Sequence, residues 1–150
     1  MPHEPRLRDY LTRDEVAALL RSSKKVRHGA RNHAMILLAY RHGLRASELV
    51  NLRASDLDLR DRRPQADYVF LSERANRMSR SAFWRIVVQA GECAGLAVHA
   101  YAHLLRHSCG YYLANKGCDL RLIQDYVGHK QIQNTVRYTT LNPARFAGLW

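Results

Sequence analysis

The stretch from His103 to Tyr138 begins with HLLRH, passes through a GH pair and ends with VRY. His103 and Arg106 are three positions apart, so in a helix their side chains leave the same face. His129 adds a second imidazole, and Tyr138 a phenol. With Arg45 from the first half of the chain, the set holds two guanidiniums, two imidazoles and one phenol. These groups are suited to binding a phosphodiester and attacking its phosphorus.

Capping signals and apolar spacing predict a mainly helical domain around this stretch. Thr12 and Glu15 have the spacing of a capping box, and Gly43 is placed to end a second, largely apolar helix. Ser47 is expected to cap a short third helix, which puts Arg45 in the turn before it. The expected helices cover about 12–22, 30–41, 47–52, 79–90, 102–116, 119–127 and a last segment, capped by Asn134, that carries Tyr138.

The hydrophobic period changes between residues 55 and 72. Leu57 and Leu59 alternate with charged residues, and an apolar run follows at Tyr68–Leu71. This pattern predicts two short strands with a turn between them. The expected fold class is therefore mainly α with a small antiparallel β-sheet, in a single domain over residues 1–150 whose first ten residues form a loosely held arm.

The chain is strongly basic. It has 24 Lys and Arg residues against 13 Asp and Glu, a net charge of +11, and Arg outnumbers Lys twenty to four. Arginine favours bidentate recognition of phosphate, so nucleic acid is the expected partner; a basic solvated surface is the alternative.

Composition also argues against several other classes. Three cysteines with no C-x-x-C pair predict neither a disulfide framework nor a zinc ribbon. The N-terminus is polar, and no apolar run approaches the roughly 20 residues that span a bilayer. We therefore expect a cytoplasmic protein that does not enter a membrane.

Four ordered motifs carry a family resemblance: GLRASEL, HLLRHS, LIQDYVGH and TVRYT. Together they resemble the tyrosine recombinase (phage integrase) family, and within it the regulatory recombinases of type 1 fimbriae. The likeness runs from LTRDE near Thr12 to ARFAGLW at the end of the sequence. It implies the family's catalytic-domain fold and a site-specific recombinase that inverts or integrates DNA, including fimbrial phase variation.

The resemblance also implies roles for five residues. Arg45 and Arg106 would clamp the scissile phosphate, while His103 and His129 would hydrogen-bond it and help to move protons. Tyr138 would be the nucleophile and form a 3′-phosphotyrosyl bond, with no metal, ATP or other cofactor.

Further expectations concern support, DNA and assembly. Glu48 matches the family's acidic position and would orient the site, and the expected DNA contacts are Arg77, Arg80, Lys130 and Arg137. The partner would be double-stranded DNA, with four protomers on two synapsed sites and a monomer or weak oligomer when free. The C-terminal segment would dock onto a neighbouring protomer.

One departure from the family pattern affects the chemistry. The family places a catalytic Lys on a β-hairpin between its first Arg and the H-x-x-R motif, where it protonates the leaving 5′ oxygen. No Lys lies between Arg45 and His103, which are only 58 positions apart. The region around 60–67 is consistent with loss of the hairpin and a helix, and the sequence also leaves no room for a separate N-terminal DNA-clamp domain.

Two other functions stay open at this point. The missing Lys favours a catalytically impaired DNA-binding relic or regulator with the same fold. The other alternative is a zinc protein that uses His99, His103 and His107, which have i, i+4, i+8 spacing. The zinc hypothesis would leave the arginines without a role.

Overall fold

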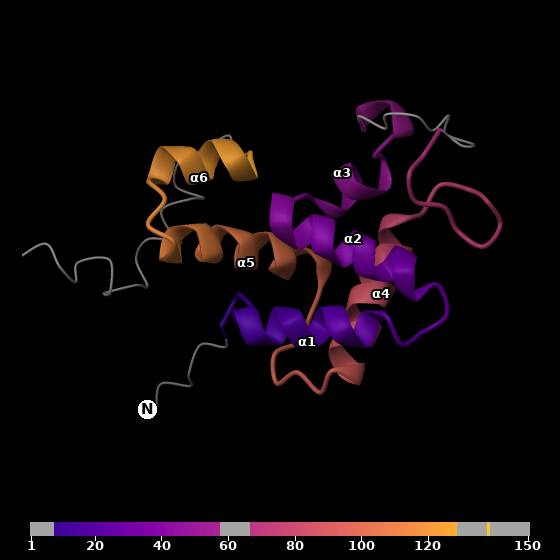
Figure 1. Cartoon of the computed structure of the whole chain (residues 1–150), viewed down its shortest axis with the longest axis horizontal. Helices are drawn as coiled ribbons and strands as arrows, with labels where there is room; N and C mark the ends of the chain where they lie inside the picture. Colours follow the sequence, from indigo (N-terminus) through magenta and orange to yellow (C-terminus); the bar gives the residue numbers. More distant parts are fainter. Residues whose placement is uncertain (1–7, 58–66, 129–137, 139–150) are drawn as a thin grey trace, which may run out of the picture.

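The structure, a computed structural model, describes residues 8–57, 67–128 and 138. In this part of the chain the elements are helical (Figure 1). They are α1 (Arg13–Ser23), α2 (Gly29–His42), α3 (Ala46–Val50), the 3₁₀ turn η1 (Ala54–Asp56), α4 (Arg80–Cys93), α5 (Ala102–Asn115) and α6 (Leu120–Val127).

The predicted helix ends are confirmed where capping chemistry is strong. The Thr12 hydroxyl accepts the Glu15 N–H, and the Glu15 carboxylate accepts the Thr12 N–H, which makes the predicted capping box. Ser79 and Asp119 likewise accept backbone N–H groups at the starts of α4 and α6. Gly43 ends α2 in the left-handed conformation, with φ of 60°.

The third helix begins earlier than predicted. Ser47 lies inside α3, and Arg45 occupies the N-cap position. A carboxylate oxygen of Glu48 accepts the Arg45 N–H at 2.8 Å, which ties the N-cap residue to the first turn of the helix.

The predicted sheet is represented in the described residues only by two isolated antiparallel bridges, Arg53–Tyr68 and Leu71–Arg77. The start of the first predicted strand is instead the η1 turn, because the Asp56 carboxylate accepts the Arg53 N–H and closes a tight turn. Leu59 and the cap predicted at Asn134 lie outside the described residues.

The core has two parts, and both involve α5. The first lies among α1 to α5, where α2 packs along α5 and α1 packs on α4. The second lies where α6 covers the second half of α5 (Figure 1). It consists of Tyr111, Ala114, Ile123, Val127 and Tyr138. Each fully buried apolar side chain stabilises the fold by about 1.5–3 kcal/mol. Packing on both halves of α5 therefore holds His103 and Arg106 in place.

The longest helices described, α2, α4 and α5, have 14 residues each. No helix in the described ranges has the length and apolar character that a membrane crossing requires.

Candidate active site

Arg106 is the central buried charge of the candidate site. Its side chain leaves α5 and is only 2% exposed. Nη1 donates a 2.6 Å hydrogen bond to the Gly43 carbonyl at the end of α2. Nη2 is buried and has no hydrogen-bond partner among the described residues. Leaving a buried donor unpaired costs about 1–3 kcal/mol, and more for a charged group, so the geometry favours an anionic ligand at Nη2.

Arg45 approaches the same region from the N-terminus of α3. Its guanidinium donates to Glu48 at 2.9 Å, and the same carboxylate accepts the Arg45 backbone N–H. Glu48 therefore holds Arg45 at two points. The Arg45 side chain remains 44% exposed, so its guanidinium can meet a ligand from solvent.

Several charged or ionisable groups act on the pKa of Arg106. Burial lowers the pKa of Arg106, and the nearby positive charge of Arg45 lowers it further. Glu48 and the ionised form of Tyr138 act on the pKa of Arg106 in the opposite direction. The two guanidiniums repel each other, and that repulsion would be relieved by a shared phosphate between them.

Tyr138 lies against α5 with 1% of its surface exposed. Its hydroxyl is 3.0 Å from Nδ1 of His107. Its ring packs edge-on against Tyr111, with ring centroids 5.0 Å apart. A Cβ at position 110 would overlap the Tyr138 ring, so Gly110 is what allows the ring to approach the helix.

His103 lies one helical turn before His107, and the two rings meet edge to face with centroids 4.4 Å apart. His103 is exposed at the start of α5, while His107 is buried at 7%. The two imidazoles therefore connect the surface of the site to the Tyr138 hydroxyl.

The predicted site residues thus fall into two groups. The structure brings Arg45, Glu48 and Arg106 together, with Tyr138 in electrostatic range and His103 on the same helix. His129, Lys130 and Arg137 lie outside the described residues. The roles of all these residues stay predictions.

Two predicted DNA contacts lie next to this region. Arg80 is exposed at the start of α4 and lines a hollow of about 440 Å³ together with His103 and the 48% exposed Trp84. Arg77 is also exposed; it donates to the Asn51 side chain, and its guanidinium lies 5.8 Å from the centroid of the Tyr68 ring.

A zinc site is not supported by these histidines. His99 precedes α5 and stacks on Tyr101, so it does not share a helix face with His103 and His107. Within the described residues no group of three His, Cys, Asp or Glu side chains is placed to hold a metal ion.

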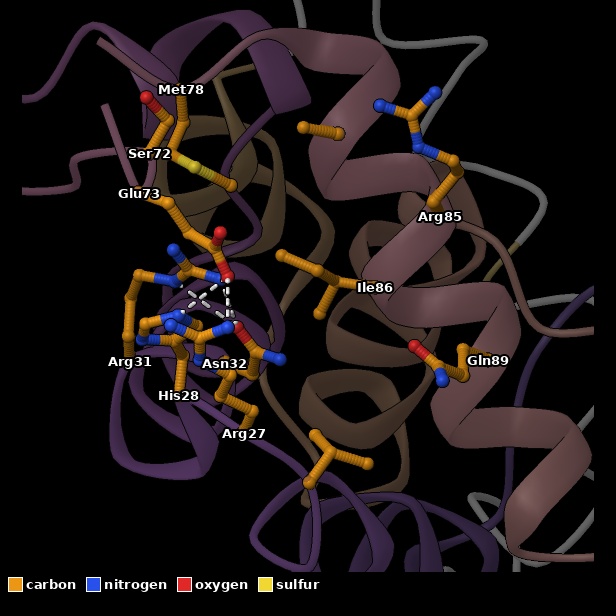
Figure 2. A pocket seen from close by; sticks show the side chains of 12 residues that line it. Arg27, His28, Arg31, Asn32, Ser72, Glu73, Met78, Arg85, Ile86 and Gln89 are labelled. Carbon is orange, nitrogen blue, oxygen red and sulfur yellow. Dashed lines mark hydrogen bonds and ion pairs between the residues drawn. The ribbon is translucent and has the colours of Figure 1, made fainter. Parts of the chain in front are cut away.

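A separate hollow of about 480 Å³ opens at the other end of α2 (Figure 2). The helix has 14 residues and so is about 20 Å long, which separates this hollow from Gly43. Arg27 and His28 both pair with Glu73, and Arg31 donates to Asn32 and to the Leu71 carbonyl. These contacts join the start of α2 to the loop before α4. The candidate site around Arg106 lies at the opposite end of α2, at Gly43.

His107 contacts Tyr138 in the candidate site, and the sequence did not predict this position for it. Its i+4 spacing from His103 was visible, but it favoured a metal site or a packed core residue. The relevant partner, Tyr138, is 31 positions away, and no helical periodicity predicts that contact.

Fold and sequence agree on one class of protein, the tyrosine site-specific recombinases. The chain belongs to the phage integrase family, which it matches over residues 9–65 and 60–145. It is 41% identical to the type 1 fimbriae regulatory protein FimE of Escherichia coli (strain K12), over 95% of this chain and 91% of that protein.

Solved structures support the same fold. The crystal structure of XerA recombinase superposes with a TM-score of 0.81 and 25% identity, covering 99% of this chain and 64% of XerA. The XerH recombinase bound to its palindromic difH substrate gives a TM-score of 0.79 at 21% identity, over 91% of this chain and 51% of XerH.

The comparison with FimE also locates a difference in length. The alignment has 180 positions but takes in 95% of 150 residues, about 142, so about 38 positions have no counterpart in this chain. The two segments that match the family overlap at residues 60–65. A chain that lacks the family's sequence at this point would give such an overlap.

Proposed function

We propose that this chain is a site-specific DNA recombinase that inverts or integrates DNA, as in fimbrial phase variation, and that Tyr138 is its nucleophile. One observation carries the proposal: a buried arginine donor, Nη2 of Arg106, has no hydrogen-bond partner among the described residues and lies in range of Arg45 and Tyr138. A backbone phosphate placed there would accept from both guanidiniums.

The proposed reaction follows from the charge that develops on the phosphate. As the Tyr138 oxygen attacks phosphorus, negative charge grows on the non-bridging oxygens. Arg45 and Arg106 stabilise that charge, Glu48 keeps Arg45 in place, and His103 hydrogen-bonds the phosphate. The bond to the 5′ oxygen breaks, and a 3′-phosphotyrosine remains.

The covalent intermediate is what makes strand exchange possible. The phosphotyrosyl bond retains the energy of the phosphodiester, so a 5′-hydroxyl from another strand can displace Tyr138 without ATP. His129 would contribute a further hydrogen bond to the phosphate. Two DNA sites contain four strands, and each chain supplies one phenol, so we propose a tetramer on synapsed DNA and a monomer or weak oligomer when free.

Double-stranded DNA is the proposed partner, and the basic charge supports this. We propose that Arg80, Arg77, Lys130 and Arg137 contact backbone phosphates. The hollow that contains Arg80 also contains His103, which would place bound DNA across the starts of α4 and α5.

The missing Lys favours a second candidate, a regulator that binds DNA without cleaving it. No Lys lies between Arg45 and His103 to protonate the leaving oxygen. Loss of a general acid typically costs about 10²–10⁴ in rate, so binding could persist while cleavage is slow.

Nicked duplex DNA separates the two candidates. A pool of duplexes with a randomised core and a nick beside it traps any covalent complex, because the short fragment diffuses away. We expect adducts that survive boiling in detergent from the unmodified chain and none from Tyr138→Phe. The matched control is Tyr126→Phe, which removes a hydroxyl that donates to the Arg41 carbonyl at 2.7 Å and should leave adduct formation intact. DNA binding without adduct would identify the regulator instead.

A further inference from the structure

The contact between His107 and Tyr138 has no part in the chemistry described so far. Nδ1 of His107 lies 3.0 Å from the Tyr138 hydroxyl, and both side chains are buried, at 7% and 1% exposed. A buried hydroxyl at this distance makes a full hydrogen bond to the imidazole. The group that attacks phosphorus is therefore already bonded to a potential proton acceptor.

The surroundings fix the geometry of this pair. Gly110 gives the Tyr138 ring room against α5, and Tyr111 packs edge-on against the same ring. The Tyr111 hydroxyl donates to Asp9 at 3.0 Å, which ties the packing ring in place. On the other side, the His103 ring meets the His107 ring edge to face. These contacts pack both rings in the orientation that the hydrogen bond between them uses.

The ordinary pKa values of the two groups set the direction in which a proton can move between them. A phenol has an ordinary pKa near 10 and an imidazole near 6.5, so in the resting protein the proton belongs on the tyrosine. Attack on phosphorus removes the phenol's negative charge as it develops, and the proton can then pass to the imidazole along the existing hydrogen bond. For Nδ1 to accept, the neutral ring must carry its own proton on Nε2.

We propose that His107 is the general base that takes the Tyr138 proton during strand cleavage. In this step the O–H proton of Tyr138 moves to Nδ1 of His107, the bond from the phenol oxygen to phosphorus forms, and the bond to the 5′ oxygen breaks. The 5′ oxygen takes up a proton from water. In the reverse half, a 5′-hydroxyl attacks phosphorus and gives up its proton to water, the bond from phosphorus to the phenol oxygen breaks, and the imidazolium returns its proton to the departing phenol. The inference rests on the proposed recombinase function.

Two substitutions separate proton transfer from positioning. In His107→Asn the amide oxygen takes the approximate place of Nδ1, so it can accept the phenol hydrogen bond but not the proton. In His107→Ala both are lost. The matched control is His99→Asn, an exposed histidine outside α5.

Two substrates separate the base from the acid. One is the nicked duplex with its natural 5′ oxygen; in the other, sulfur replaces that bridging oxygen. A thiolate leaves without needing a proton, so the sulfur substrate rescues a missing acid but not a missing base.

We expect His107→Asn and His107→Ala to form adduct about 10²–10⁴-fold more slowly than the unmodified chain on both substrates, at unchanged DNA affinity. His99→Asn should match the unmodified chain. The inference is overturned if His107→Asn cleaves within a few-fold of the unmodified chain, or if sulfur restores the His107 variants.

The contact itself is tested without activity. The chain is labelled with 3-fluorotyrosine, and its fluorine NMR signals are recorded. The signal that is absent from Tyr138→Phe belongs to position 138. This signal should shift in His107→Ala and stay unchanged in His99→Asn. An unshifted signal overturns the contact and the inference. If the unmodified chain forms no adduct on either substrate, the recombinase function fails and the proton transfer fails with it, whereas the fluorine shift still reports whether the contact exists.

Discussion

The guanidinium of Arg106 and the carbonyl of Gly43, 63 positions apart in the chain, are joined by a 2.6 Å hydrogen bond. The bond occupies Nη1, while Nη2 is buried at a place where the described residues supply no acceptor. The planar fork of arginine allows one nitrogen to hold the fold while the other meets a ligand.

Arg106→Lys should separate these two roles. A lysine keeps the charge but has one nitrogen, which cannot bond Gly43 and a phosphate in the same geometry. We expect adduct formation to fall about 10²–10³-fold, the usual loss when one donor to a developing oxyanion is removed. Covalent capture on nicked DNA measures this. Arg21→Lys, which changes an exposed residue in the last turn of α1, should be unchanged; full activity in Arg106→Lys would exclude the bidentate role.

Gly110→Ala should destabilise the chain through Tyr138. The added Cβ overlaps the Tyr138 ring, and overpacking typically costs about 1–3 kcal/mol. Urea denaturation measures the loss. In a Tyr138→Ala background the overlap is gone, and the same change should stabilise α5 by about 0.5–1 kcal/mol, as is usual for Gly→Ala within a helix. Equal losses in both backgrounds would place the strain elsewhere.

Glu48 gives the stability of the chain a pH dependence. Burial would raise the pKa of Glu48, but the hydrogen bonds from the Arg45 backbone and guanidinium, with the charges of Arg45 and Arg106, hold that pKa below its usual value. A lowered pKa in the folded state stabilises the chain above the unfolded value near 4.5, and this contribution is lost as pH falls through the folded pKa.

We therefore expect Glu48→Gln to lower the free energy of unfolding by about 0.5 kcal/mol at pH 7, and this difference from the unmodified chain to become smaller at pH 3. Denaturant curves at the two pH values test this. Glu92→Gln, which changes an exposed glutamate in the last turn of α4, should show no such loss at pH 7. A loss for Glu48→Gln that is as large at pH 3 as at pH 7 would assign it to packing rather than charge.

The leaving group should limit cleavage in the unmodified chain. With no Lys between Arg45 and His103, the natural 5′ oxygen lacks the lysine that serves as its acid in the family pattern, while a bridging sulfur needs no acid. We expect the sulfur substrate to be cleaved about 10²–10⁴-fold faster than the oxygen substrate, the range that general-acid catalysis covers. Single-turnover rates on the two duplexes give the ratio. Similar rates would mean that another group of the chain supplies the proton.

Arg80→Ala should reduce the salt dependence of DNA binding. A plot of log affinity against log salt has a slope of about −0.9 for each phosphate contact on duplex DNA, so removal of one contact should flatten it by about 0.9. Fluorescence anisotropy from 50 to 300 mM salt measures the slope. Arg21→Ala also removes one charge and should leave the slope unchanged. The same slope in Arg80→Ala would place its guanidinium away from DNA.

Local signals predicted the helices well because their chemistry is local. The Thr12 capping box and the glycine at position 43 depend on residues within a few positions, so the sequence alone places those ends. The start of α3 was misplaced by choosing Ser47, because the Glu48 carboxylate accepts the Arg45 N–H and the helix has its N-cap two positions earlier, at Arg45. Arginine is not a usual N-cap residue, so the sequence favoured the nearby serine.

The candidate site was only partly predictable. The spacing of the HLLRH motif placed Arg106 beside His103, but it did not reveal that Arg106 is 2% exposed and bonded to Gly43. Burial of a charge is normally disfavoured, so no sequence rule would choose it for this arginine. The His107 contact with Tyr138 likewise depends on how the chain returns to α5 after α6.

The burial of Tyr138 affects how easily its ring can be chemically modified. Oxidants, nitrating agents and tyrosine kinases act on rings that water can reach. In the free chain they would meet Tyr126, which is 46% exposed, well before Tyr138, which is 1% exposed. The phenol on which the proposed reaction depends is thus shielded from such modification, and a chain with oxidised surface tyrosines would still carry an intact Tyr138.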